Sequence, residues 1–321
     1  ASGNSVAIVS TDGEYSYVGR LVVTFDDNGV LDPASIDANV SGAYATTDGV
    51  VQGLWGSLDA AFADGTKGNK VKQVTDAVEG VVTSKDSNIF GSASVFLEGR
   101  RTAVRTQETN MGNLTADANL FYAQSVDSTV TVSIKNGGGI RNPIGEVVEV
   151  EPGVYELQPS QANDLSGKQE GQISQLDIEN TLRFNNGLTL LTVTALELKQ
   201  ILEHGVAATE DGATPGQFPQ VSGIAFSFDP TKTAIEFDDN GNVITNGERI
   251  QSLAIKDAQG NNLDVIVQDG QVVGDANRTI RLVTLNFLAD GGDSYPFDTF
   301  GKDRVDLVQD DVRDGAATFA D

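Results

Sequence analysis

Cysteine is absent from this sequence, which excludes disulfides, thiolate metal sites and cysteine nucleophiles. Histidine occurs once, at His204, and a lone imidazole cannot build a histidine-rich zinc or two-metal centre. No apolar run approaches the roughly 18 residues of a membrane span. Basic residues number 21 against 46 acidic ones, and a formal charge of −25 disfavours binding to nucleic-acid polymers or anionic membranes. A small anionic ligand would therefore need a local group of arginines.

Other features point to a folded chain of mixed structure. Its 321 residues are 39% apolar, which is enough for a core and suggests two domains or one large domain with an appendage. The sequence begins without a signal peptide, so we expect a processed chain or part of a longer one. Helical and strand patterns follow one another without a regular βαβ order, which predicts an α+β fold with a mixed β-sheet and packed helices.

Periodicity places the individual elements. Valines at helical spacing predict a helix over 71–85, and a second helix is expected over 109–124 with Met111, Leu114, Ala118 and Phe121 on one face. Strands are expected at 5–10, 15–25, 92–99 and 128–136, a hairpin at 146–157 and a strand and helix over 188–206. Further strands are expected over 222–267, and a strand that ends in a glycine-rich loop over 279–293.

The helix expected before residue 206 carries the single histidine. Its apolar spacing and a following glycine predict an amphipathic helix that ends at Gly205. His204 then has two interpretations, a polar group at the helix C-terminus or a catalytic side chain. The apolar positions are Leu196, Leu198, Ile201 and Leu202.

Two Asp-Asp-Asn-Gly segments, at 26–29 and 238–241, raise the question of calcium. Asp238, Asn240 and Asn242 carry side-chain oxygens at alternate positions, as calcium ligands do. An EF-hand also needs a glycine at its sixth position and a glutamate at its twelfth. Val243 and Arg249 occupy those positions. Hairpin turns are therefore the favoured interpretation.

The stretch Asn-Gly-Gly-Gly-Ile-Arg at 136–141 has the physical parts of a ligand loop. Glycine lets a backbone approach a ligand closely, and successive N–H groups can bind an anion. Arg141 adds a forked cation that suits phosphate or vicinal hydroxyl groups. A tight turn after a strand is the alternative.

Three more stretches occur with this loop: VRTQETNMGNLTAD at 104–117, LRFNNGLTLLTVTALELKQILEHGV at 182–206 and LNFLADGGD at 285–293. In this order the four motifs resemble the C-terminal domain of 5'-nucleotidases, most firmly over 92–141, 180–228 and 280–297. The segment at 12–29 also resembles the end of that family's metallophosphoesterase domain. The resemblance thus covers most of the chain.

The resemblance implies a nucleotide site. The family stacks the base between two phenylalanines, which match Phe184 and Phe287, and stacking suits any base. Its ribose-binding aspartate matches Asp293. Its glycine loop matches Asn136, Gly138, Gly139 and Arg141, and the arginine ahead of Asn-Met-Gly-Asn matches Arg105; these arginines face ribose and phosphate in the family. Departures are Arg183, where the family has proline, Ser294, where Gly-Gly-Asp-Gly becomes Gly-Gly-Asp-Ser, and a longer connection at 145–180.

The family's two divalent metals are held by Asp-x-His and Asn-His-Glu elements, which this sequence lacks. No residue is therefore assigned as catalytic or metal-binding, and the chain alone is expected to be inactive. We interpret 1–70 as a remnant of, or strap to, an absent metallophosphoesterase domain, 71–90 as a linker helix and 91–321 as the nucleotide-binding domain. The parent protein would be a secreted or periplasmic bacterial phosphohydrolase that acts on nucleotides.

Two other functions remain to be weighed. A non-catalytic extracellular binding or structural module could keep this fold and lose the ligand, and would show no nucleotide affinity. An independent enzyme is disfavoured, since no Gly-x-Ser-x-Gly element, Ser–His pairing or carboxylate dyad is evident.

Overall fold

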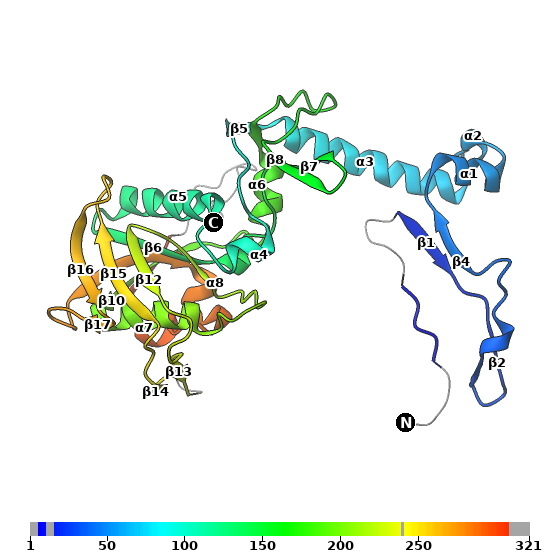
Figure 1. Ribbon diagram of the computed structural model, residues 1–321. Helices are drawn as coiled ribbons and strands as arrows, with labels where there is room; N and C mark the ends of the chain where they lie inside the picture. Colours follow the sequence, from blue (N-terminus) through cyan, green and yellow to red (C-terminus); the bar gives the residue numbers. More distant parts are fainter. Residues whose placement is uncertain (1–5, 11–15, 239–240, 308–321) are drawn as a thin grey trace. The chain divides into compact units, whose positions relative to one another are not determined.

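The computed structural model describes residues 6–10, 16–238 and 241–307, and the chain divides into two compact units. Unit 1 is Ala1–Val82 and unit 2 is Thr83–Asp321 (Figure 1). Each unit is described by itself.

Unit 1 consists of short elements. Strand β1 (Tyr17–Arg20) pairs with β4 (Gly42–Ala45), and β2 (Thr24–Phe25) pairs with β3 (Leu31–Asp32). The other elements are η1 (Pro33–Ser35), α1 (Asp48–Trp55), α2 (Leu58–Ala61) and the start of α3 (Lys67–Ser87). The strand expected at 5–10 is wrong for residues 6–10, which have no regular secondary structure, and Ser5 lies outside the described residues. Over its described residues, 16–25, the strand expected at 15–25 is two short strands, and Tyr15 lies outside the described residues.

Unit 1 buries little apolar surface. Of its described hydrophobic residues only Leu31 and Ala61 are buried, whereas Val18, Phe25 and Trp55 are each more than half exposed. Helix α3 confirms the helix expected at 71–85, and its valines are exposed as well. The described part of unit 1 therefore lacks a hydrophobic core of its own.

Unit 2 is built on a five-stranded mixed sheet in the order β11-β6-β18-β10-β19. Strands β6 and β18 are parallel, and the other neighbours are antiparallel. The bounds are β11 Pro219–Ser222, β6 Val130–Asn136, β18 Thr279–Leu285, β10 Leu188–Thr194 and β19 Lys302–Leu307.

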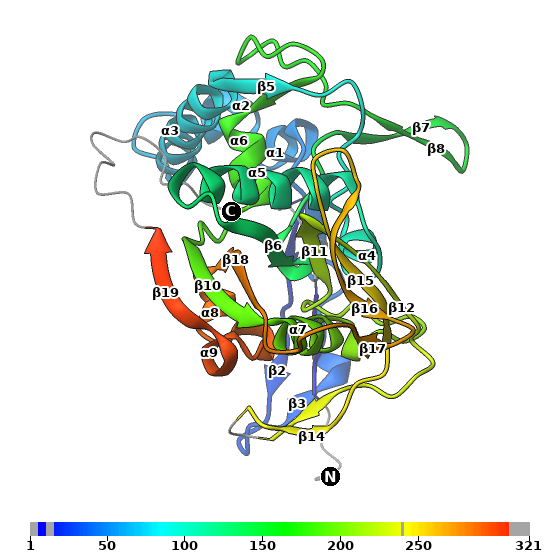
Figure 2. The ribbon, with the colours of Figure 1, turned by 90° about the vertical axis from the view of Figure 1, so that its left-hand side faces the viewer.

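Helices cover both faces of this sheet. Helix α5 (Asn110–Val126) packs on one face, and α7 (Ala195–Ala207) packs between the other face and a second sheet (Figure 2). The three central strands are therefore buried on both sides, and between their Val, Ile and Leu residues they also bury polar ones such as Ser133, Thr189 and Thr284. The predicted α+β fold with a mixed sheet is confirmed.

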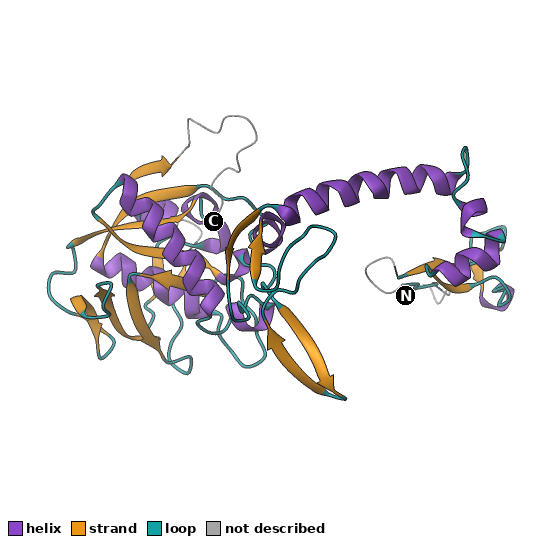
Figure 3. Ribbon diagram, turned by 90° about the horizontal axis from the view of Figure 1, so that it is seen from above, coloured by secondary structure: helices purple, strands orange, loops and turns teal. Residues whose placement is uncertain are grey.

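The second sheet is antiparallel, in the order β12-β15-β16-β17. Two smaller hairpins are formed by β7 with β8 and by β13 with β14. The β7–β8 hairpin extends from unit 2 (Figure 3). The bounds are β12 Ile224–Phe228, β15 Ile250–Lys256, β16 Asn262–Gln268, β17 Gln271–Val272, β7 Glu146–Glu151, β8 Val154–Gln158, β13 Glu236–Phe237 and β14 Val243–Thr245.

The Asp-Asp-Asn-Gly segment at 26–29 forms a turn, and in the segment at 238–241 the described residues Asp238 and Gly241 are joined by a backbone hydrogen bond. Asp26 accepts hydrogen bonds from the backbone N–H groups of Asn28 and Val30, and Asp238 accepts one from the N–H of Asn242. Each carboxylate thus closes its own turn, as the favoured interpretation predicts. Asn240, the third oxygen donor considered for calcium, lies outside the described residues.

One prediction near α5 is wrong. The strand expected at 92–99 ends at Ser92, because β5 (Ile89–Ser92) finds its partner in β9 (Gln172–Ser174) and only Leu97 forms a bridge beyond it. The helix at 109–124 is confirmed, but Leu114 and Phe121 are exposed. Small and polar side chains occupy its buried face, because the helix lies close to the sheet; they include Gly112, Thr115, Ala116, Asn119 and Ala123.

The end predicted for helix α7 at Gly205 is wrong because the helix continues to Ala207. The Arg249 guanidinium reaches across from the segment before β15 and donates to the carbonyl oxygens of Val206, Ala207 and Thr209. A cation at these C-terminal carbonyls takes the place of a glycine cap. Gly205 is needed for space instead, since a Cβ there would lie 2.8 Å from the Tyr295 hydroxyl.

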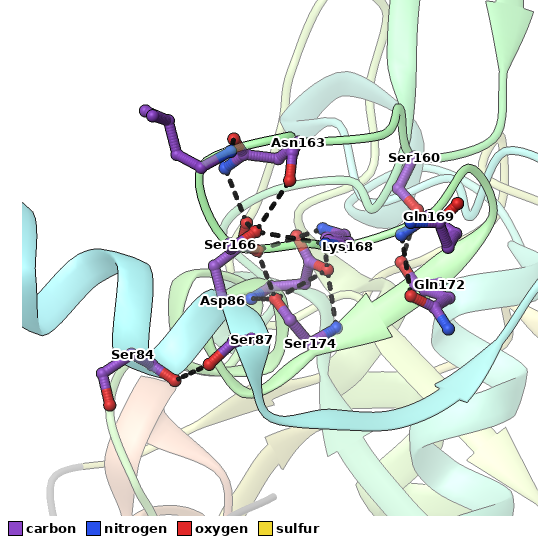
Figure 4. Close-up of polar contacts among 12 residues, drawn as sticks. Ser84, Asp86, Ser87, Ser160, Asn163, Ser166, Lys168, Gln169, Gln172 and Ser174 are labelled. Carbon is purple, nitrogen blue, oxygen red and sulfur yellow. Dashed lines mark hydrogen bonds and ion pairs between the residues drawn. The ribbon is translucent and has the colours of Figure 1, made fainter.

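The last turn of α3 is held by a buried polar network (Figure 4). Asp86 is 4% exposed and accepts hydrogen bonds from Asn163 (2.8 Å), Ser166 (2.7 Å) and Ser174 (2.8 Å). The Lys168 ammonium lies 3.3 Å from the same carboxylate. Burial by itself raises the pKa of Asp86, but these hydrogen bonds and the lysine charge together lower it to about 2.

Candidate nucleotide-binding site

The candidate site lies at one edge of the five-stranded sheet. Because β6 and β18 are parallel, the segments that follow them leave at the same edge. Strand β10 is antiparallel to β18 and pairs Leu188 with Leu285, so the segment before β10 reaches that edge too. The segment before β11 does so for the same reason, since Pro219 pairs with Asn136.

Short helices surround this edge. Helix η2 (Gly137–Gly139) follows β6, while α8 (Asn286–Ala289), η3 (Gly292–Ser294) and α9 (Phe297–Phe300) follow β18. Helix α6 (Gln175–Thr181) precedes β10, and α4 (Arg101–Val104) contacts η2. Every residue assigned to the site from the sequence lies on one of these elements, at the end of β6 or in the loops beside them.

Both phenylalanines are on the surface. Phe184 is 55% exposed and Phe287 is 43% exposed, although a phenylalanine is ordinarily buried. Their segments are joined by two hydrogen bonds between Gly187 and Asn286, of 2.8 and 3.0 Å. Within the described residues the two rings make no direct ring contact. The arrangement that would sandwich a base therefore stays a prediction.

Arg141 lies beside one of these rings, and Arg105 and Arg101 lie near it. The Arg141 guanidinium lies 5.5 Å from the ring centroid of Phe184 and donates to the Gly138 carbonyl at 3.4 Å. Arg105 is 8% exposed, and its Nε is buried without a hydrogen-bond partner. Burial and the charges of Arg101 and Arg141 lower the pKa of Arg105, and Asp293 opposes them. This cationic group is a local exception in a strongly acidic chain.

Asp293 is the carboxylate of the site. Its Oδ2 accepts a hydrogen bond of 2.6 Å from Nδ2 of Asn136, which is 4% exposed. A Cβ built on Gly216 would lie 3.3 Å from this Oδ2 and 3.7 Å from the Arg105 Nη1. The Asp293 carboxylate and the Arg105 guanidinium therefore both lie beside Gly216.

The three glycines act differently from the sequence interpretation. The N–H groups of Gly137 and Gly138 donate to the carbonyls of Phe218 and Gly216, so these two do not form an anion-binding concavity. All three glycines are buried, and a Cβ on Gly137 would lie 1.9 Å from the Val104 carbonyl oxygen. The Gly138 carbonyl accepts the hydrogen bond from Arg141, and Gly139 is the last residue of η2.

Sequence reasoning missed Arg101 and Asn286. Arg101 lies one helical turn before Arg105, a spacing that places two side chains on one face, and its Nε donates to Thr214 Oγ1 at 3.2 Å. Arg183, the other departure near the site, is exposed and donates to the Asn180 carbonyl. No pattern in the sequence marks Asn286, whose role depends on the pairing of β10 with β18.

Comparison with known proteins decides the family. The model of the family described as "5'-nucleotidase, C-terminal domain" matches residues 81–301. The chain belongs to this family. The 5'-nucleotidase C-terminal domain therefore accounts for nearly all of unit 2 and for every candidate site residue.

Relatives of this family are similar over most of the chain. The trifunctional nucleotide phosphoesterase protein YfkN of Bacillus subtilis (strain 168) is 26% identical over 301 residues, 94% of this chain and 16% of that protein. A snake venom 5'-nucleotidase of Gloydius brevicauda is 26% identical over 307 residues, 91% of this chain and 40% of that protein. The chain thus spans less than half the length of either relative.

A solved structure agrees with the fold. The crystal structure of a 5'-nucleotidase precursor from Thermus thermophilus matches with a TM-score of 0.55 and 26% identity, over 91% of this chain and 44% of that one. In the part of this 5'-nucleotidase C-terminal domain chain that the structure describes, no helix is long and apolar enough to cross a membrane. The same residues contain no group of three His, Cys, Asp or Glu side chains that could hold a metal ion.

Proposed function

We propose that this chain is the substrate-binding part of a 5'-nucleotidase-type phosphohydrolase. The base stacks between Phe184 and Phe287, the ribose hydroxyls bind the Asp293 carboxylate, and the phosphate faces Arg105 and Arg141. The observation that carries the proposal is the meeting of exposed aromatic rings, a carboxylate and arginines at one sheet edge, where the Arg105 Nε has no hydrogen-bond partner. An aromatic face binds the base, and a guanidinium binds the phosphate.

Titration with adenosine and AMP, followed by two-dimensional NMR, tests this proposal. We expect shifts at the sheet edge and saturation within the millimolar range. Phe184→Ala and Phe287→Ala should each weaken adenosine binding about fivefold to tenfold, since each removes one stacking face. Phe121→Ala removes an exposed phenylalanine of α5 that lies beside Thr131 and Ser222, at the opposite end of β6 and β11, and should leave binding unchanged.

Unchanged spectra at millimolar AMP would contradict the proposal and favour a module that kept the fold without the ligand. Equal losses in all three alanine variants would also count against it, because stacking is then not the cause. Thermal melting with calcium and with EDTA tests the non-catalytic module further. Calcium that binds only the folded state would raise the midpoint of unfolding.

Phosphate cleavage is proposed to belong to a metallophosphoesterase domain outside this chain. The described residues do not fit the two divalent metals of such an enzyme, because they offer no cluster of ligands. Unit 1 supports the proposal through its exposed apolar side chains, which suit a strap packed on another domain. We propose an extracellular or periplasmic bacterial enzyme, in keeping with the venom relatives and the acidic surface.

The parent protein tests this assignment. Antibody against this chain should remove an EDTA-sensitive AMP hydrolase from the medium or periplasmic fraction. Trypsin should spare the bond after Arg20, the single tryptic site within 16–66, in the parent protein and cleave it in the chain alone. A cytoplasmic location would overturn the localisation. Equal cleavage in both forms would overturn the strap.

A further inference from the structure

The loop that carries Asp293 has an unfavourable backbone. Asp293 and Ser294 both have positive φ, of 49° and 60°, directly after Gly291 and Gly292. Left-handed backbone is uncommon for residues other than glycine, and two such residues in succession persist only where neighbours hold them. Some contact must therefore fix this loop.

His204 makes such a contact from the last turn of α7. Its Nε2 lies 2.9 Å from the main-chain oxygen of Asp293. That oxygen can only accept, so Nε2 carries the proton. Burial lowers the pKa of His204, and the ring is therefore neutral at pH 7 with its single N–H aimed at this carbonyl.

The imidazole is itself held in place. Its ring meets Tyr295 edge to face at 4.9 Å and Phe237 at 6.1 Å. Gln217 donates to the His204 carbonyl at 2.7 Å, and the Tyr295 hydroxyl donates to the Gln217 carbonyl at 2.6 Å. Tyr295 is 1% exposed and directly follows the left-handed pair. Helix, ring and loop form one packed unit.

We propose that His204 is the positioning residue of the site, holding the Asp293 main chain so that its carboxylate faces the ligand. It does not touch the ligand. Asn136 donates to the carboxylate of Asp293, whereas His204 donates to its main-chain oxygen. The side chain and the main chain of Asp293 are therefore held by separate donors. The proposal rests on the proposed function for its ligand, while the loop geometry can be tested without one.

Wild-type protein gives the first test. Nitrogen shifts of the His204 ring should show the tautomer with hydrogen on Nε2 at pH 7. A ring with hydrogen on Nδ1 cannot donate to Asp293 and would overturn the proposal.

Two variants separate donation from packing. His204→Phe keeps a ring against Tyr295 but removes the donor, whereas His204→Gln supplies an amide N–H at a similar distance. The backbone carbon shifts of Asp293 and Ser294, which follow φ, should change in His204→Phe and stay near wild type in His204→Gln. Unchanged shifts in His204→Phe would overturn the proposal.

Affinity for adenosine gives the functional readout. His204→Phe should weaken binding about fivefold to tenfold and His204→Gln less than about twofold. In an Asp293→Ala background His204→Phe should add less than about twofold, because the carboxylate that it positions is gone. Equal losses in both backgrounds would show a general structural role and overturn the proposal. If wild type binds no adenosine, the proposed function fails, and the loop shifts alone decide the role of His204.

Discussion

Replacing Asp86 by alanine is expected to lower the free energy of unfolding by about 3–5 kcal/mol. The change leaves Lys168 with Asp177 as its remaining carboxylate partner, and it removes the acceptor of three buried hydrogen bonds. Unmade hydrogen bonds in a buried site cost more than the bonds themselves contribute. Urea unfolding of the whole chain at pH 7 measures the effect.

A neighbouring carboxylate provides the control. Asp164 lies between Asn163 and Ser166, two partners of Asp86, but is exposed, so Asp164→Ala should change the free energy of unfolding by less than about 0.5 kcal/mol. Losses of similar size in both variants would mean that the network does not anchor the end of α3.

The effect of Asp86 should also depend on pH. Its pKa falls from 3.8 to about 2 on folding, so the unfolded chain binds more protons between these values. The stabilisation, about 2 kcal/mol, is complete above pH 4 and is lost as the pH falls toward 2. The difference in stability between wild type and Asp86→Asn should therefore narrow below pH 4. A constant difference from pH 7 to pH 2.5 would contradict this.

Replacing Arg141 by methionine is expected to weaken AMP binding by about tenfold to a hundredfold and adenosine binding by only about twofold. Arg141 is exposed and engages the fold through a long hydrogen bond to Gly138, so the variant should remain folded. A phosphate group gains charge-assisted hydrogen bonds from this guanidinium, which a nucleoside cannot make. The small loss for adenosine reflects the missing cation over Phe184.

Arg183→Met is the matched control for this experiment. Arg183 is exposed beside Phe184 and donates to the Asn180 carbonyl, so its removal changes the net charge equally without touching the proposed phosphate position. Calorimetry with both ligands measures the two variants. Equal losses for AMP and adenosine in Arg141→Met, or equal losses in both variants, would contradict a direct phosphate contact.

The strongly patterned elements could be predicted because their signals are local. The valine spacing of α3, the strand and helix over 188–206 and the turn residues at 26–29 each determine a conformation without help from distant parts of the chain. The strand expected at 5–10 is wrong over its described residues, 6–10, because a strand also depends on pairing with another segment, which apolar residues alone do not specify. The helix end predicted at Gly205 is wrong because Arg249, 44 positions later, donates hydrogen bonds to the last carbonyls of the helix.

The family, the α+β class and the surface acidity were determined by the sequence alone, because motif order, periodicity and charge are properties of the chain itself. Only the tertiary structure decided which side chains meet. The parallel pairing of β6 with β18 brings Asn136 to Asp293 across 157 positions, and α7 brings His204 to the same residue across 89. It also decided that the N–H groups of Gly137 and Gly138 are used within the fold. Contacts of this kind depend on strand register and helix packing, which no short stretch of sequence encodes.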